Sequence, residues 1–259
     1  MRKIKIVLLH LLCFVVLTAL SQVGGVLWLF SLFLSIKLKE KKRYVFPIVY
    51  LVFNVLIIPP IANQLGRKKL PVFQRQLQPK NLFYPLLFRN YVDEDLEMVL
   101  KMSSSKLFKK DIGITYLDAN FPFLDGFALL PHRSHDDGKK IDISFMYLDN
   151  KGKSTNKKPS ISGYGVYVNE TNITTNNCLK KGYWQYDFPK YLTFGTINML
   201  KLDEIKTRSI IEEFLSHRKT EKIFIEPYIK QNLNLNSNKI RFHGCKAVRH
   251  DDHIHLQTK

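Results

Sequence analysis

The stretches IDISFMY at residues 141–147 and HDDHIHL at residues 250–256 decide the fold, because both alternate between apolar and polar side chains. Successive side chains of a β-strand point to opposite faces, so Asp142 lies on the face opposite to the aliphatic residues of the first stretch. For the same reason His253 and His255 share one face. If these two strands are neighbours in one sheet, Asp142 and His255 lie over the same surface.

A further group of histidine and carboxylate side chains precedes the first strand, in HRSHDDGKKID at residues 132–142. His135 lies seven residues before Asp142, an odd offset that one straight strand would place on opposite faces, and Gly138 supplies a point where the chain can turn. His135, Asp142 and His255 then provide three ligands for one metal ion. Imidazole and carboxylate groups suit Zn²⁺, and three protein ligands leave a fourth position for water, as in catalytic zinc sites.

The remaining histidines of the two stretches suit catalytic roles. Zinc lowers the pKa of its bound water to about 7, so that a neighbouring base can take a proton from it. His253, on the same face as His255, is the first choice for this base, and Asp252 is the second. His132 and His250 are expected to orient ligands, contact substrate or stabilise a developing oxyanion. Three further carboxylates are expected to lie in solvated loops: Asp136, Asp137 and Asp251.

The two motifs in this order resemble the penicillin-insensitive murein endopeptidases. More broadly they are similar to the zinc peptidases that group lysostaphin-type enzymes with D-Ala-D-Ala peptidases. The resemblance covers roughly residues 113–256, with a supporting match in IFIEPYIK at residues 223–230. It implies that His135, Asp142 and His255 bind zinc and that His253 belongs to the catalytic apparatus. The chain departs from the family around the basic pair at residues 139–140, and residues 150–190 show no alignment with it.

The resemblance implies a zinc metallopeptidase that hydrolyses a peptidoglycan peptide bond, in a cross-link that contains a D-amino acid, and the apolar N-terminal quarter of the chain predicts that it is membrane-anchored. Two alternatives stay open. The first is a D,D- or L,D-carboxypeptidase or dipeptidase of the same metal family. The second is a non-catalytic, zinc-containing cell-wall-binding protein whose metal is structural, as in hedgehog-like relatives.

The N-terminal quarter of the chain is mostly apolar, in three runs at residues 4–20, 26–36 and 44–62. The first and third approach the roughly 20 residues that cross a bilayer, and the second does so if it begins near Gln22. Basic clusters at residues 2–5 and 37–43 favour the cytoplasm. Three spans then place the rest of the chain outside a bacterial cytoplasmic (inner) membrane, in the periplasm. Alternatively, the first run is a signal peptide cut near Ser21, which leaves two spans and the same orientation.

The pattern therefore predicts three segments. These are a membrane anchor of two or three transmembrane helices (1–64), a linker with a short helix (65–110) and a zinc peptidase domain (111–259). Helices are expected at residues 93–100 and 203–219, and strands at 112–117, 127–130, 141–148, 223–225 and at the C-terminal histidines. The predicted fold class is α+β, with a small antiparallel sheet that carries the zinc site and is flanked by helices, after N-terminal transmembrane helices.

The formal net charge of +18 favours anionic partners, here the membrane surface and the peptidoglycan of the cell wall. No nucleic-acid-binding motif accompanies this charge, so nucleic acid is not an expected partner. Cys178 and Cys245 could form a disulfide in an oxidising compartment, but two cysteines alone do not establish the pairing.

Overall fold

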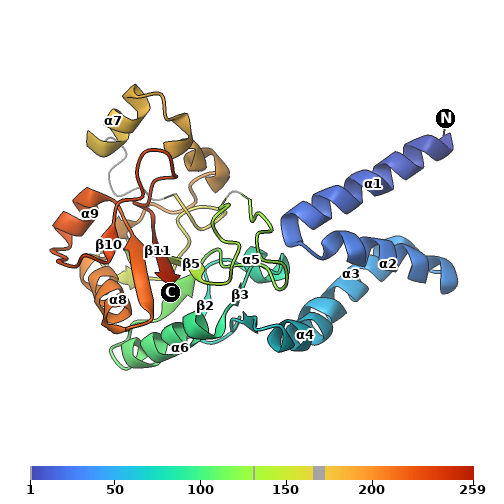
Figure 1. Ribbon diagram of the computed structural model, residues 1–259, viewed down its shortest axis with the longest axis horizontal. Coiled ribbons are helices and arrows are strands. Elements are labelled where there is room, and N and C mark those ends of the chain that lie inside the picture. The colour runs from blue at the N-terminus through green and yellow to red at the C-terminus, as the bar shows by residue number, and fades with distance from the viewer. Residues whose placement is uncertain (1, 131, 166–172) are drawn as a thin grey trace.

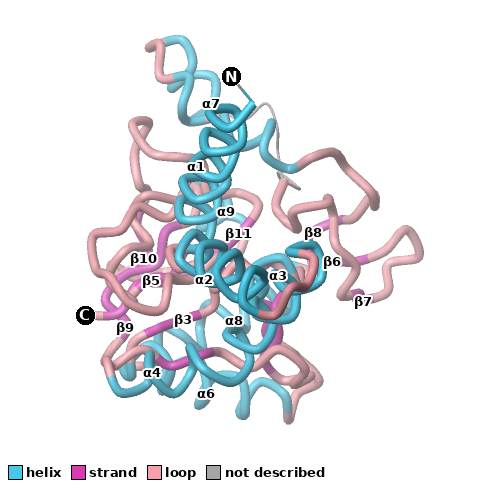
Figure 2. The backbone as a smooth tube through the Cα atoms, turned by 90° about the vertical axis from the view of Figure 1, so that its right-hand side faces the viewer, coloured by secondary structure: helices cyan, strands magenta, loops and turns pink. Residues whose placement is uncertain are grey.

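A bundle of N-terminal helices projects from a mixed α/β domain that contains the C-terminus (Figure 1). The computed structural model describes residues 2–130, 132–165 and 173–259. Helix α2 (Gly24–Lys37) packs against both α1 (Arg2–Ser21) and α3 (Lys42–Val52). Helix α3 continues through a π-helical segment, η1 (Phe53–Ile57), into α4 (Ile58–Gln64). Figure 2, viewed from the helix side, places α1–α3 in front of the domain.

Two of these helical stretches, Lys3–Ser21 and Lys42–Gln64, are long and apolar enough to cross a membrane. Only 6% of the first and 28% of the second is buried inside the protein. Most of their apolar surface is therefore left for contact with a membrane or another protein. Helix α2, at 14 residues, is shorter. A signal sequence also meets these criteria. The first run is therefore still predicted to be either a membrane span or a cleaved signal peptide.

Polar side chains attach the helices to the domain. In the turn between α1 and α2, Gln22 Oε1 accepts hydrogen bonds from the N–H groups of Phe123 and Leu124 at 3.0 and 3.3 Å. In the π-helical segment, Asn54 donates to the carbonyl oxygens of Pro85 and Leu86 at 2.9 and 3.2 Å. Both side chains are buried, and burial without such partners is costly. These contacts attach the domain to the turn after α1 and to the middle of the helical stretch 42–64.

A six-stranded sheet forms the centre of the domain, in the order β10-β9-β11-β5-β4-β2. Its strands are β2 (Leu77–Pro79), β4 (Ile114–Tyr116), β5 (Lys140–Ser144), β9 (Thr220–Phe224), β10 (Ile240–Arg241) and β11 (His253–Thr258). The four inner strands are antiparallel to one another, as expected. Both edge strands, β2 and β10, are parallel to theirs, so the sheet is mixed rather than purely antiparallel.

Helices α6 (Glu94–Phe108) and α8 (Glu204–Ser216) pack on the apolar face of this sheet. Each has an aspartate N-cap, since Asp93 accepts from the N–H of Leu96 at 2.8 Å and Asp203 from that of Lys206 at 3.1 Å. Together with the isoleucines and leucines of β5 and β11, their apolar side chains make the main core. The polar side chains of β5 and β11 are therefore left on the opposite face.

Shorter strands and helices make up the rest of the secondary structure in the described residues. Two short sheets pair β1 (Lys68–Lys69) with β3 (Tyr91–Val92), and β6 (Tyr147–Leu148) with β7 (Ser154–Thr155) and β8 (Lys201–Leu202). The remaining helices are α5 (Phe83–Leu86), α7 (Ile173–Lys180), α9 (Pro227–Asn232) and two 3₁₀ turns, η2 (Trp184–Tyr186) and η3 (Phe188–Thr193).

Several boundaries differ from the sequence-based expectations. Residues 127–130 are a loop, where the Leu130 carbonyl accepts from the Arg89 side chain instead of a neighbouring strand. The strand expected over 141–148 divides into β5 and β6 of different sheets, because the N–H of Met146 donates to the Thr207 hydroxyl. Within the expected linker, residues 77–79 form the edge strand β2 of the central sheet.

Candidate metal centre

Strands β5 and β11 are antiparallel neighbours, and their register places His255 opposite Asp142 and His253 opposite Ser144. This is the arrangement that strand alternation predicts. Ile143 and Ile254 lie in the main core, so the histidines and the aspartate face the other way. The site thus stands on the rigid centre of the sheet.

Three side-chain atoms form a compact triangle on this face. His255 Nδ1 lies 2.9 Å from Asp142 Oδ1, His135 Nε2 lies 3.2 Å from His255 Nδ1, and His135 Nε2 lies 3.3 Å from Asp142 Oδ1. Ligand atoms bonded at about 2.0 Å to a tetrahedral zinc ion lie about 3.3 Å apart, so the triangle has the size of one face of such a tetrahedron. All three side chains are almost fully buried.

His135 reaches this triangle from the loop before β5. Its Nδ1 lies 2.9 Å from the carbonyl oxygen of Ala119. A carbonyl oxygen only accepts hydrogen bonds, so Nδ1 carries a proton, and Nε2, which faces Asp142 and His255, is the nitrogen that can bind a metal ion. The chain turns at Gly138, whose φ of 83° favours glycine, as the odd offset required.

His132 lies beside the triangle. Its Nδ1 is 3.2 Å from Asp142 Oδ2, 3.2 Å from Asp118 Oδ2 and 3.5 Å from the Tyr164 hydroxyl. His132, His135 and Asp142 bring their ligand atoms within 4.8 Å of one another, and this group could hold a metal ion. Two overlapping sets of ligands therefore share His135 and Asp142.

His253 and Asp252 form a pair next to the triangle. His253 Nδ1 lies 2.6 Å from Asp252 Oδ1, and the other carboxylate oxygen of Asp252 accepts from the N–H of Gly165 at 2.6 Å. His253 Nε2 is buried, 3.6 Å from Asp142 Oδ1, and has no hydrogen-bond partner among the described residues. A buried polar atom of this kind fits a site whose occupant is a metal ion or its water.

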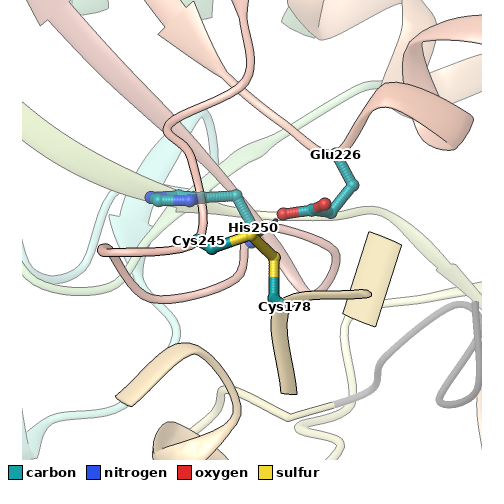
Figure 3. The surroundings of a disulfide bond; sticks show 4 residues. All are labelled: Cys178, Glu226, Cys245 and His250. Atoms are coloured by element: carbon teal, nitrogen blue, oxygen red, sulfur yellow. Dashed lines mark hydrogen bonds between the residues drawn. A yellow bond between two sulfur atoms is a disulfide. The ribbon is translucent and has the colours of Figure 1, made fainter. Parts of the chain in front are cut away.

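His250 is close to the other histidines but farther from the triangle. Its ring centroid is 5.0 Å from that of His253 and 5.6 Å from that of His255. Its backbone N–H donates to Glu226 Oε1 at 3.1 Å, which holds the start of this segment. A disulfide joins Cys178 of α7 to Cys245, shortly before His250 (Figure 3). The bond that the sequence left open is therefore present and braces the loop leading to His250.

The electrostatics of the cluster centre on Asp142. Burial alone raises the pKa of Asp142, but His135, His253 and His132 together hold it well below its usual value. Burial lowers the pKa of His255 to about 4, against the opposing effect of Asp142. At neutral pH the Asp142 carboxylate is ionised and the His255 ring is neutral, the forms in which both groups bind metals.

Asp251 corrects one expectation, because it is fully buried rather than solvated. It pairs with the Arg249 guanidinium and accepts from the Tyr228 hydroxyl at 2.8 Å. The other two carboxylates expected in loops, Asp136 and Asp137, are partly exposed and lie near Lys140. Burial of Asp251 is possible only because a charged partner is buried with it.

Three residues at the site carried no motif in the sequence. Asp118 follows β4, forms a two-point ion pair with Arg89 (2.6 and 2.8 Å) and contacts His132. Tyr164 donates to Asp142 Oδ2 at 2.7 Å and thereby orients that carboxylate. The aspartate after a short apolar strand was a weak signal for Asp118. For Arg89 and Tyr164 the sequence offers none, because they reach the site from loops.

A pocket of about 540 Å³ opens beside this cluster. Its polar wall includes Asp118, His132, Asp252 and His253. The volume lies within the roughly 300–1,000 Å³ of typical ligand sites. The triangle itself is buried, and His253, 3.6 Å from Asp142 Oδ1, lies between it and this pocket wall.

No known protein-family model matches the chain, and a search of curated proteins gives no significant match. Inferences about its function therefore rest on its own residues.

Proposed function

We propose that the chain is a zinc-dependent metallopeptidase, held by its N-terminal helices at the outer face of a membrane, that hydrolyses peptide bonds of peptidoglycan. The observation that carries the proposal is the triangle of His135 Nε2, Asp142 Oδ1 and His255 Nδ1, with edges of 2.9–3.3 Å beside a ligand-sized pocket. Two imidazoles and one carboxylate, with a position left for water, are ligands typical of catalytic zinc.

His255 is favoured over His132 as the third ligand. His132 Nδ1 lies 3.2 Å from a carboxylate oxygen of Asp118 as well as 3.2 Å from one of Asp142, so Asp118 competes with a metal ion for this nitrogen. His255 Nδ1 instead completes the triangle with His135 Nε2, the nitrogen left for a metal ion because Nδ1 bonds to the Ala119 carbonyl. His132 is assigned to the substrate side of the site.

Each neighbouring group then has a defined task. Bound Zn²⁺ would supply a Lewis acid and an activated water molecule. His253 Nε2, with no other described partner, is placed to take and return a proton, and Asp252 holds its ring through Nδ1. His132, held by Asp118 at the pocket wall, is placed to stabilise negative charge that develops on the substrate.

The peptidoglycan substrate rests on the resemblance of the two histidine motifs and on the predicted outer location of the domain. A carboxypeptidase of the same metal family is the second candidate. A cation in a pocket can bind a terminal carboxylate, and Lys158 lines this one. An endopeptidase and a carboxypeptidase differ in the products that they release.

The test uses the full chain in detergent, loaded with zinc and incubated with purified cross-linked muropeptides. Products are read by mass spectrometry beside a His255→Ala variant. We expect cross-linked dimers to be converted to monomers by the wild type alone, with the gain of one water per bond.

The other outcomes are equally distinct. Release of a single terminal residue would establish the carboxypeptidase. Binding of one zinc per chain without any product would contradict the proposed hydrolysis and favour a cell-wall-binding protein.

A further inference from the structure

The pocket beside the metal centre connects a predicted membrane-spanning helix with the proposed catalytic base. Leu20, in the last turn of α1, lines the same pocket as His253 and Asp252. The Gln22 side chain, hydrogen-bonded to the backbone of Phe123 and Leu124, holds this end of α1 against the domain. The pocket therefore adjoins the place where α1 meets the domain.

Most of the pocket wall is apolar. The apolar side chains that line it include Leu20, Phe83, Leu130, Ile161, Leu192 and Phe194. Four of them remain at least half exposed: Phe194 (67%), Leu130 (55%), Ile161 (51%) and Phe83 (50%). If a peptide with several polar groups occupied this pocket, its backbone amides would lie against the apolar wall. An apolar lining that reaches from a spanning helix to a polar reaction centre instead matches an amphiphile, with its chain in the wall and its polar part at the histidines.

We propose that this pocket receives the acyl chain of a lipid-anchored peptide, which enters from the bilayer surface while its scissile amide reaches His253. This inference rests on the proposed peptide-bond hydrolysis and adds a second substrate class, an acylated peptide, to the peptidoglycan peptides. Water adds across the amide, with hydroxide going to the carbonyl carbon and a proton to the nitrogen. A carboxylate and an amine leave, and no other reactant is required.

Burial of each methylene group is worth roughly a fourfold change in an equilibrium constant, so chain length should control turnover. The test reconstitutes the zinc-loaded full chain in phosphatidylglycerol–phosphatidylcholine vesicles. It compares kcat/KM for one peptide that carries either an acetyl or a tetradecanoyl group. We expect the wild type to prefer the tetradecanoyl peptide by at least 100-fold.

Partition of the tetradecanoyl peptide into the vesicles also raises its local concentration. The wild-type ratio alone therefore does not show that the pocket binds the acyl chain. Phe194→Asn removes part of the apolar wall, and Asn tolerates the φ of 59° at this position. Phe73→Asn is the matched control, since Phe73 is 87% exposed and does not line the pocket. We expect the tetradecanoyl-to-acetyl ratio to fall about tenfold in Phe194→Asn and to stay at the wild-type value in Phe73→Asn. Equal ratios in all three proteins would overturn the proposal.

A second experiment does not depend on turnover. The His255→Ala variant is mixed in the same vesicles with a tetradecanoyl peptide that carries a diazirine at the end of its chain, then irradiated and digested. We expect cross-links at Leu20, Ile161 or Leu192. Cross-links confined to the outward surface of α1–α3 would contradict binding of the acyl chain in this pocket. Pocket labels without hydrolysis by the wild type would instead retain the pocket and reject the proposed enzyme.

Discussion

His255 lies directly opposite Asp142 across the paired strands β11 and β5, and 2.9 Å separate His255 Nδ1 from Asp142 Oδ1. The sheet register alone therefore positions two groups of the candidate metal centre. Only His135 has to be brought in by a loop, and its bond to the Ala119 carbonyl holds it there. A site built on central strands keeps its geometry better than one built on loops, which suits a metal with strict distance requirements.

Asp142→Asn should abolish tight zinc binding. The change removes the negative charge and one ligand oxygen. Loss of a residue that only hydrogen-bonds to a metal ligand already costs about 10–100-fold in metal affinity. We therefore expect zinc affinity to fall by more than about 100-fold, measured by competition with a chromophoric chelator. Asp136→Asn makes the same chemical change at a partly exposed carboxylate and should bind zinc like the wild type. Equal loss in both variants would contradict the assignment of Asp142.

Asp252→Asn should separate catalysis from metal binding. An amide in place of the carboxylate no longer accepts the proton on His253 Nδ1 firmly, so the ring loses the orientation that a base requires. We expect kcat to fall by roughly 10²–10⁴-fold, in the range of general acid–base effects, while one zinc per chain remains. Turnover of the muropeptide and zinc content are measured on the same sample. Loss of zinc together with activity would show that Asp252 supports the metal instead.

The alternation of β5 and β11 was readable from the sequence because period-2 patterns depend only on neighbouring residues. The pairing of Asp118 with Arg89 and His132 was not readable, since these residues meet through loops without any periodic signal. The burial of Asp251 was missed for a related reason. An aspartate before a strand normally indicates a solvated turn, and only the fold places the Arg249 guanidinium against it.

Removal of the disulfide in a Cys178→Ser/Cys245→Ser variant should destabilise the domain. The bond closes a sequence separation of 67 residues, and loop-closure entropy predicts a loss of about 4 kcal/mol in the free energy of unfolding. Urea unfolding in detergent micelles measures this loss. Cys13, the free cysteine of α1, provides the matched control, and Cys13→Ser should unfold like the wild type. Identical midpoints for both variants would argue against a structural role for the bond.

Lys80 should make stability depend on pH. It is buried, donates to Asn156 Oδ1 at 3.0 Å, and desolvation lowers its pKa from 10.5 to about 7. Burial thus disfavours the charged form in the folded state. The resulting penalty is complete below pH 7 and disappears as the pH rises toward the pKa of the unfolded chain. The free energy of unfolding of the wild type should rise across this window relative to Lys80→Met, with a limiting slope of about 1.4 kcal/mol per pH unit.

Urea unfolding at pH 7 and pH 9.5 measures this difference for Lys80. Lys151→Met, at an exposed lysine, should follow the wild type at both pH values. If Lys80→Met and the wild type keep a constant difference in stability, Lys80 is charged in the folded protein throughout.

Gln22→Asn should loosen the attachment of the helices to the domain. Asn tolerates the φ of 63° at this position, but its side chain is one methylene shorter and no longer reaches the N–H groups of Phe123 and Leu124. These N–H groups are only partly buried, so each lost hydrogen bond costs about 0.5–1.5 kcal/mol, and we expect the amides of residues 123 and 124 to exchange with deuterium about two- to tenfold faster. Gln231→Asn, at an exposed glutamine of α9, should leave these amides unchanged. Because Gln22 also holds the end of α1 that lines the pocket, unaltered exchange would remove the physical link between the helices and the site.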